Sequence, residues 1–273
     1  MNASTLIDVG AARIAHLKWT LAVEALVANP KESIEIQSHQ NCALGRWIHA
    51  SGLQAYGNSD AMQLLVRTHK NFHEAAHALT TNEQRDSKHL KESLGDFMTL
   101  SRDIIFYLTE IELDSLELRH KKQVIAHPVS SLMHRLFNGP HHALPDNRGP
   151  LNVSYARLLH LNWARSLTKA FRGWGHDAHL ESAEDCTLGD WLRTTDASLR
   201  KKHIEINYLR ATHKKFHTQA EETLMFLRRR SENAAQKSYT KTLRLSREII
   251  YVLSLMELKL LDSGIVVCEE GLI

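Results

Sequence analysis

Apolar positions along the chain recur every three or four residues, the spacing of one face of an α-helix. The longest stripes run from Leu94 to Leu116 and from Leu243 to Leu261, and no stretch alternates as a strand would. The pattern predicts helices over residues 4–28, 42–52, 59–80, 86–122, 153–172, 186–195, 197–231 and 233–262. Asn41 and Asp185 are predicted to cap the helices that start at the next residue, a cysteine in each case. We therefore expect an all-α fold.

The chain contains one pattern twice. His16-Leu-Lys-Trp19 recurs as His160-Leu-Asn-Trp163, a shift of 144 residues from position 16 to position 160. Three more motifs recur at a shift of 144 or 145: Cys42-Ala-Leu-Gly-Arg-Trp47 as Cys186-Thr-Leu-Gly-Asp-Trp191, Thr68-His-Lys-Asn-Phe-His73 as Thr212-His-Lys-Lys-Phe-His217, and Ser101-Arg-Asp-Ile-Ile105 as Ser246-Arg-Glu-Ile-Ile250. One domain has been duplicated in tandem.

The duplication and the helical pattern together predict two tandem four-helix bundles. They occupy residues 4–122 and 153–262, with a linker over 123–152 and a tail over 263–273. Within the linker, Pro128 to Phe137 carry an apolar stripe that predicts a short amphipathic helix. Such a stripe either covers a neighbouring domain, which is the simpler interpretation, or docks a partner.

Composition narrows the class of protein. Of the 273 residues, 43% are hydrophobic and 24% charged, as in an average globular protein. The apolar run from Ile249 to Met256 is far shorter than the ~18 residues of a membrane span. The N-terminus lacks the features of a secretory signal, and three cysteines fit a reducing compartment, so we expect a cytoplasmic protein. The net charge is only +3. We interpret the basic clusters of the chain as solvent-exposed helix faces, and we expect no nucleic-acid partner.

The 18 histidines are the unusual feature, because histidine both binds metals and titrates near neutrality. His69 and His73, four residues apart on one helix face, can present two imidazoles to one ion. Cys42 at a helix N-terminus offers a thiolate favoured by the helix dipole, and His16 from the first helix completes four ligands.

The second copy repeats this set at identical separations, as His160, Cys186, His213 and His217. Three histidines and one cysteine form a donor set typical of zinc, so we predict one zinc ion per repeat and two per chain. Three other histidines lack a histidine counterpart and are left out: His39, His49 and His77.

The other repeated residues have structural interpretations. Gly45 and Gly189, in the first turn of the cysteine helix, are expected to allow the close approach of a neighbouring helix or of the metal. Large aromatic residues are expected to anchor the core and to shield the zinc from water: Trp19, Trp47, Phe72, Trp163, Trp191 and Phe216.

A first-helix histidine followed by Cys-x-Leu-Gly-x-Trp and His-x-x-x-His resembles the chemoreceptor zinc-binding (CZB) domain family. The resemblance covers roughly residues 4–120 and 153–262. It implies four-helix bundles that hold one zinc through three histidines and one cysteine, and that regulate bacterial chemoreceptors or diguanylate cyclases.

The same resemblance implies a protein partner in chemotaxis or cyclic-di-GMP signalling. It also implies that the bundles pair, either as a pseudo-dimer within one chain or as a homodimer. The chain itself has neither a cyclase signature nor a long methyl-accepting coiled coil, so the expected role is that of an input module.

Other classes fit the sequence less well. A zinc hydrolase of the zincin type needs a glutamate directly after its first histidine, where this chain has Lys70 and Lys214. A complete four-ligand shell also leaves no open position for an activated water, so we predict that the protein is not an enzyme. A di-iron oxygen binder would need several inward carboxylates. The main rival is structural zinc in a helical interaction scaffold that does not switch.

Overall fold

The computed structural model describes residues 3–29, 36–81, 87–126, 153–173, 181–194 and 204–262. Every regular element in these ranges is helical, which confirms the all-α prediction. The predicted linker helix, most of the linker and the 263–273 tail lie outside the described residues.

The described helices form two sets that follow the two halves of the sequence. The first set is α1 (Ala3–Ala28), α2 (Ala43–Trp47), the π-helical turn η1 (Ile48–Gly52), α3 (Leu53–Tyr56), α4 (Asp60–Thr81) and α5 (Ser87–Ala126). The second set is α7 (Val153–Phe171), α8 (Thr187–Thr194), α10 (Ile204–Arg228) and α11 (Glu232–Asp262).

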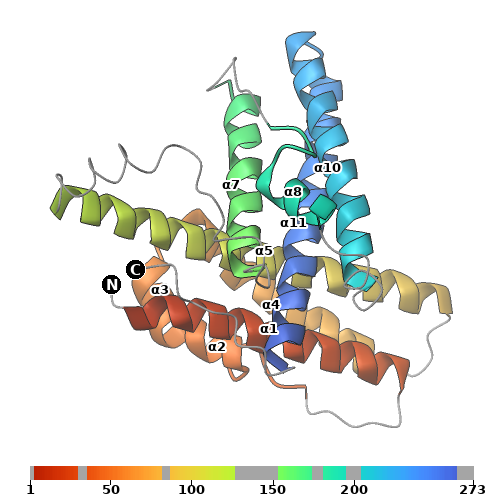
Figure 1. The fold of residues 1–273 in the computed structure, drawn as a ribbon. Helices are drawn as coiled ribbons and strands as arrows, with labels where there is room; N and C mark the ends of the chain where they lie inside the picture. Colours follow the sequence, from red (N-terminus) through yellow and green to blue (C-terminus); the bar gives the residue numbers. More distant parts are fainter. Residues whose placement is uncertain are drawn as a thin grey trace.

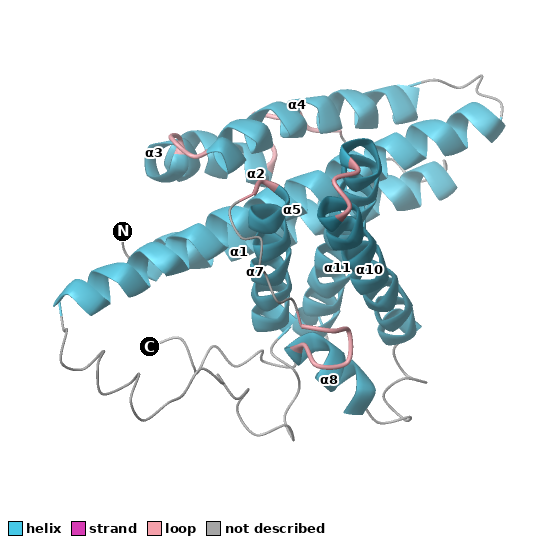
Figure 2. Ribbon diagram, turned by 90° about the horizontal axis from the view of Figure 1, so that it is seen from above, coloured by secondary structure: helices cyan, strands magenta, loops and turns pink. Residues whose placement is uncertain are grey.

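Each half builds its own layer of long helices. In the first half α5 packs against α4 and α1, and in the second half α11 packs against α10 and α7. In Figure 1 the long helices of the first half run across the view and those of the second half stand upright, and Figure 2 shows the same crossing from above. The short helices α2 and α8 lie against α1 and α7, respectively, and each begins directly after a predicted cysteine ligand.

The halves also touch each other, through contacts of α11 with α5 and α1 and of α7 with α5. Fully buried Phe72 and Phe97 belong to the core of the first half, which continues into Leu161, Ile250 and Leu258 of the second half. A separate apolar cluster, which includes Phe216, fills the second half. Because packing is continuous across α5 and α11, the division into two distinct bundles stays a prediction.

Most helix boundaries lie within three residues of the prediction, and three helices need further comment. The helix expected over 42–52 is a short α-helix followed by a π-helical turn and a further α-turn that ends at Tyr56. The helix expected to end at 122 continues to Ala126. The helix expected to begin at 197 is described from Ile204 onward, since residues 195–203 lie outside the described ranges.

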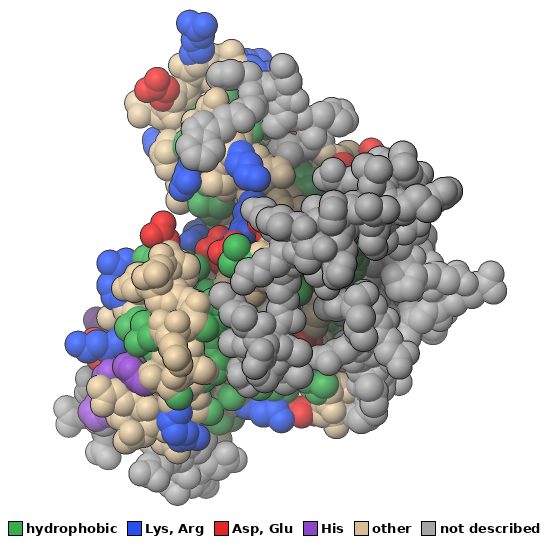
Figure 3. All heavy atoms as spheres, turned by 90° about the vertical axis from the view of Figure 1, so that its left-hand side faces the viewer, with side chains coloured by type: hydrophobic (Ala, Val, Ile, Leu, Met, Phe, Trp, Pro, Cys, Tyr) green, Lys and Arg blue, Asp and Glu red, His purple; other side chains and the backbone are tan. Residues whose placement is uncertain are grey.

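On the face at the left of Figure 1, basic and acidic side chains both lie among hydrophobic and polar groups, as the part drawn in colour in Figure 3 shows. Among the described helices, none has a stretch long and apolar enough to cross a membrane.

Candidate metal centres

Three of the four predicted ligands of the first half converge in the structure. The ligand atoms of Cys42, His69 and His73 lie within 4.8 Å of one another, and all three side chains are buried. Cys42 Sγ is 3.3 Å from His69 Nε2. The cysteine comes from the start of α2, whereas both histidines come from one face of α4, as their four-residue spacing predicts.

Cys42 itself is the N-cap of α2, so the predicted Asn41 cap is wrong. Cys42 has an extended backbone (φ −68°, ψ 164°), and its Sγ accepts the Gly45 N–H at 3.2 Å. At the second site the Gly189 N–H donates to Cys186 Sγ at 3.3 Å, while the Asp185 carboxylate accepts the Ser182 hydroxyl. In both halves the cysteine sulfur accepts the hydrogen bond that the side-chain oxygen of an N-cap residue usually accepts. These amides stabilise the thiolate form of each cysteine.

The repeated glycine is required by a backbone contact. A Cβ at Gly45 would lie 1.9 Å from the His39 carbonyl oxygen, and a Cβ at Gly189 would lie 1.7 Å from that of Ala183. The close neighbour is therefore the turn that leads into the cysteine, rather than the helix or metal that we expected. Because a carbonyl makes the contact, the exchange of His39 for Ala183 between the halves does not affect it.

A backbone carbonyl also orients the last histidine of each set. His73 Nδ1 donates to the Gln37 carbonyl oxygen at 2.8 Å, which leaves Nε2 as the atom available to a metal. His217 makes the corresponding backbone contact with Glu181, which stands 144 residues after Gln37. The loop before each cysteine thus fixes one ring nitrogen of a predicted ligand.

The second half repeats the three-residue group. Cys186 Sγ lies 3.2 Å from His213 Nε2 and 3.6 Å from His217 Nε2, and the two Nε2 atoms are 3.1 Å apart. Tetrahedral zinc with Zn–S and Zn–N bonds of normal length separates its ligand atoms by about 3.3–3.6 Å. Both groups therefore fit zinc in donor type, and the three separations of the second group lie close to those that one zinc ion requires.

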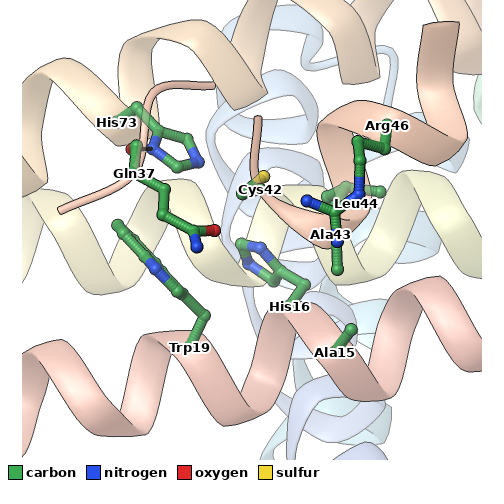
Figure 4. Close-up of a pocket in the computed structure, with 9 residues that line it drawn as sticks. All are labelled: Ala15, His16, Trp19, Gln37, Cys42, Ala43, Leu44, Arg46 and His73. Carbon is green, nitrogen blue, oxygen red and sulfur yellow. Dashed lines mark hydrogen bonds between the residues drawn. The ribbon is translucent and has the colours of Figure 1, made fainter. Parts of the chain in front are cut away.

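His16 and His160, the predicted fourth ligands, are not members of these groups. The Nε2 atom of His16 lies 3.1 Å from Ser101 Oγ, and that of His160 lies 3.1 Å from Ser246 Oγ. His16 nevertheless lines one cavity with Cys42 and His73, and Figure 4 shows it rising from α1 toward the space between them. In the second half the rings of His160 and His213 are 6.5 Å apart between centroids.

Four of the six aromatic residues singled out in the sequence contact predicted ligand histidines: Trp19, Phe72, Trp163 and Phe216. The Trp19 and His73 ring centroids are 4.6 Å apart, and the same distance separates Trp163 from His217. Phe72 lies 4.6 Å from His16, and Phe216 lies 4.6 Å from His160. These tilted contacts cover two of the three predicted ligand histidines at each centre, which limits the access of water from that side.

Among known families, the chemoreceptor zinc-binding domain matches residues 16–80. This range begins at His16 and contains Cys42, His69 and His73. The match supports one such domain in the first half. It does not extend to the second half, and neither the curated proteins nor the solved structures contain a significant match.

Burial keeps the predicted ligand histidines of both halves in the form that binds metals. Desolvation, followed by repulsion from His73, lowers the pKa of His69 to about 3, and desolvation also lowers that of His16 well below its usual value. In the second half desolvation and His217 lower the pKa of His213 to about 3. Neutral imidazoles therefore offer their lone pairs at neutral pH.

The thiols behave differently, and not identically in the two halves. Burial raises the pKa of Cys42, although the Gly45 amide and the Arg46 charge oppose the rise. Burial raises the pKa of Cys186 to about 11, to which the charges of Glu181 and Glu184 contribute. Since a thiol must lose its proton to bind zinc, these proton affinities oppose metal binding and the cation has to displace the proton.

The sequence does not identify the two serines that contact the first-helix histidines. Ser101 and Ser246 stand out in it only as the first residues of a repeated motif. Both are fully buried, and each faces a histidine from a different helix. Their presence in a motif repeated at the same shift was the signal that could have identified them.

Proposed function

We propose that the chain is a non-catalytic, zinc-binding regulatory protein with two zinc centres. Each centre would use three histidines and one cysteine: His16, Cys42, His69 and His73 in the first half, and His160, Cys186, His213 and His217 in the second. The observation that carries the proposal is the same buried Cys–His–His group in both halves.

Support for a second CZB-like site comes from equivalent contacts rather than from the family match. Each cysteine accepts a glycine amide, each first-helix histidine faces a serine, and each last histidine meets a tryptophan ring. The residues that make these contacts come from four different helices in each half. Keeping them all at a shift of 144 or 145 residues preserves the surroundings of a site as well as its donors.

The first-helix histidine would complete the donor set in each half. Ser101 engages one ring nitrogen of His16, so the other nitrogen is the one left for zinc. With His16 as a ligand, the centre would join α1 to α2 and α4. Zinc supplies a divalent charge that stabilises the thiolate and cross-links these elements when it is bound.

A regulatory role follows if this cross-link can be released. Oxidation of the cysteine sulfur removes a ligand, which frees α1 or α7 to move and to signal to a protein partner. By family resemblance that partner belongs to a chemoreceptor or cyclic-di-GMP pathway. A zincin needs a catalytic glutamate directly after its first histidine. Here that position holds Lys70, which is exposed and pairs with Glu74 on the surface of α4. This difference supports a non-enzymatic role.

Metal analysis of purified protein tests the two centres. We expect two zinc ions per wild-type chain, one in Cys42→Ala and one in Cys186→Ala. Cys268→Ala is the control, because this cysteine has no counterpart in the repeat, and it should keep both ions. Two ions in Cys42→Ala would remove Cys42 as a ligand and contradict the assignment.

One observation favours a second candidate, a structural zinc that does not switch. Val9, Leu17 and Val23 of α1 are fully buried, so apolar packing holds this helix independently of any metal. In that case zinc would stabilise the fold without changing it. The two candidates differ in whether α1 loosens when zinc is removed.

A further inference from the structure

Four charged residues form a buried ring where the halves meet. Arg13 of α1 contacts Glu112 of α5 at 2.5 Å and Glu257 of α11 at 3.2 Å. Arg157 of α7 contacts the same two carboxylates, Glu112 at 2.9 Å and Glu257 at 2.5 Å. Both arginine side chains are at most 1% exposed. Each arginine therefore bridges an acid of its own half and an acid of the other half.

The ring obeys the internal repeat. Arg157 stands 144 residues after Arg13, and Glu257 stands 145 residues after Glu112. A second reciprocal pair follows the same rule, since Arg102 contacts Glu248 at 2.5 Å and Arg247 contacts Asp103 at 2.7 Å. The junction is thus two-fold symmetric in its chemistry, like the interface of a homodimer.

A symmetric junction cannot by itself select its partner. Two copies of the first half would present Arg13, Glu112, Arg102 and Asp103 to each other and could form an equivalent set of ion pairs. The ring and the reciprocal pair therefore favour association without distinguishing a like half from an unlike half.

Selection requires a contact that breaks the repeat, and Arg165 of α7 makes one. Its guanidinium lies 2.8 Å from Asp114, 3.6 Å from Glu117 and 3.9 Å from Glu110, all on α5. It also donates to the Glu110 carbonyl oxygen at 3.4 Å. Arg165 and Glu110 are only 22% and 24% exposed, whereas Asp114 and Glu117 are 44% and 46% exposed, so this cluster lies partly in solvent and is more withdrawn at Arg165 than at two of its acids.

The repeat gives Arg165 and its acids quite different counterparts. Leu21 corresponds to Arg165, while Leu255, Lys259 and Asp262 correspond to Glu110, Asp114 and Glu117. In a pair of first halves, three acids would face Leu21 and have no arginine. In a pair of second halves, Arg165 would face Lys259 and keep one acid. Pairing two first halves would leave acids without an arginine, and pairing two second halves would bring two positive charges together. Unpaired and like charges of this kind are how an interface rejects a wrong partner.

One exposed ion pair could also form in a pair of first halves and so does not favour the unlike pairing. Lys18 pairs with Asp262 at 3.0 Å, and in a pair of first halves it would meet Glu117 instead. The side chains of Lys18 and Asp262 are 56% and 58% exposed, and ion pairs at such exposure contribute little. This contact does not offset the loss of Arg165.

We propose that the junction is a partner-selective interface in which the first half binds the second half and rejects a second copy of itself. The symmetric ring supplies affinity, and Arg165 with its three acids supplies the choice. This inference concerns residues 13–262 of the described fold and does not depend on zinc occupancy.

The test uses the full chain, cut only after it has folded. A protease site is inserted within residues 127–152, the purified protein is cleaved, and native mass spectrometry follows the fragments on dilution. We expect one complex that contains one copy of each fragment. Complexes of two identical fragments in the wild type would overturn the proposal.

Charge reversal on α7 then identifies the selecting residue. Arg165→Asp should raise the dissociation constant of the cleaved complex by about ten- to 100-fold. Lys169→Asp is the matched control, because it makes the same charge change at an exposed position on the same helix. A second change, Asp114→Arg, should restore binding in the Arg165→Asp chain by exchanging the two charges.

One control measurement and one further variant keep the experiment decisive. Circular dichroism of the uncut variants checks that the helices are intact, and Arg165→Leu, which introduces the residue of the first half, serves if Arg165→Asp does not fold. Equal dissociation constants for the Arg165 variants and for Lys169→Asp would show that Arg165 does not select the partner.

Discussion

At the scale of single residues, the two serines behind His16 and His160 have the most specific role. Ser101 Oγ lies 3.1 Å from His16 Nε2, and Ser246 repeats the contact with His160. Such a partner fixes which ring nitrogen faces the metal, and its loss typically costs about 10- to 100-fold in metal affinity.

We therefore expect Ser101→Ala to lower the zinc affinity of the first centre by about that factor. Competition with a chromophoric chelator measures it, in a Cys186→Ala background that leaves only the first centre. Ser115→Ala is the control, because Ser115 is also buried on α5 and, within the described part of the chain, donates to the Ile111 carbonyl oxygen of its own helix. Equal affinity in Ser101→Ala and the control would mean that His16 needs no such support.

Gly45 offers a second test, of the turn that places the cysteine. Gly45→Ala would put a Cβ 1.9 Å from the His39 carbonyl oxygen, so the turn has to move and carry Cys42 with it. We expect a loss of about 1–3 kcal/mol in the free energy of unfolding and less zinc at the first centre. Urea denaturation and metal analysis measure the two effects.

The matched control for Gly45 is Gly95 on α5. A Cβ at Gly95 meets nothing within 4 Å, so Gly95→Ala should raise stability by about 0.5–1 kcal/mol through its better helix propensity. A Gly45→Ala chain with wild-type stability and zinc content would show that the turn adapts without cost.

The sequence predicts much of the site at this scale, because a repeated spacing identifies donor residues. It brings Cys42, His69 and His73 together correctly, although the full ligand sets stay predictions. The sequence does not reveal which side-chain atom accepts the hydrogen bond from the amide at the start of the helix. It therefore favours Asn41 as the N-cap, whereas the structure has the sulfur of Cys42 in that role. Nor can spacing alone show that Ser101 of α5 meets a ring from α1, since that contact depends on how the helices pack.

At the scale of elements, α1 and α7 are the parts that zinc would hold in place. If the regulatory proposal is correct, chelation or mild oxidation removes the restraint at His16 and His160. Amide hydrogen exchange should then speed up in residues 10–28 and 153–172. The paired region of α10 and α11 around Thr223 and Ser238, which bond each other at 2.9 Å, should stay protected as an internal control.

Hydrogen exchange also separates the two candidate functions. Equal protection of α1 and α7 with zinc, after chelation and after oxidation would sink the switching hypothesis and leave zinc as a structural staple. Because α1 also buries an apolar face, packing can hold this helix without metal. The experiment therefore compares the restraint from zinc with the restraint from packing.

Element boundaries were less predictable than element identity. Periodicity identified the long helices, because each buries one continuous face. It could not reveal the π-helical turn at Ile48–Gly52, where the helical spacing changes for one turn. A Cβ at Gly52 would lie 3.1 Å from the Trp47 ring, so the glycine lets that ring pack against the turn. Such a contact leaves no periodic signal.

At the scale of the whole molecule, the sequence predicts a duplication but does not predict the surfaces by which the halves meet. No sequence pattern distinguishes Arg13 and Glu112 from exposed charges on the same helices, such as Lys18 on α1 and Glu117 on α5. The two acids that Arg13 contacts lie 99 and 244 residues away from it in the chain. Only the fold shows that the repeated charges form one ring.

The ring makes stability depend on pH through Glu257. Burial by itself would raise the pKa of this carboxyl, but Arg157 and Arg13 outweigh it and lower the pKa to about 2, against 4.5 in the unfolded chain. The ionised form is therefore favoured by folding. Its contribution is complete above pH 4.5, decreases as the pH falls toward about 2, and amounts to about 3 kcal/mol at most.

Glu257→Gln should remove this part of the acid sensitivity. Because glutamine does not titrate, the difference in unfolding free energy between wild type and variant should be largest near neutral pH and shrink between pH 4.5 and about 2. Urea denaturation across this range measures it, with chelator present throughout so that zinc release does not contribute. Glu221→Gln, at an exposed position of α10, is the control and should stay close to wild type at every pH. If the Glu257→Gln difference is constant with pH, the carboxylate titrates alike in the folded and unfolded chain, and the arginines do not hold it ionised.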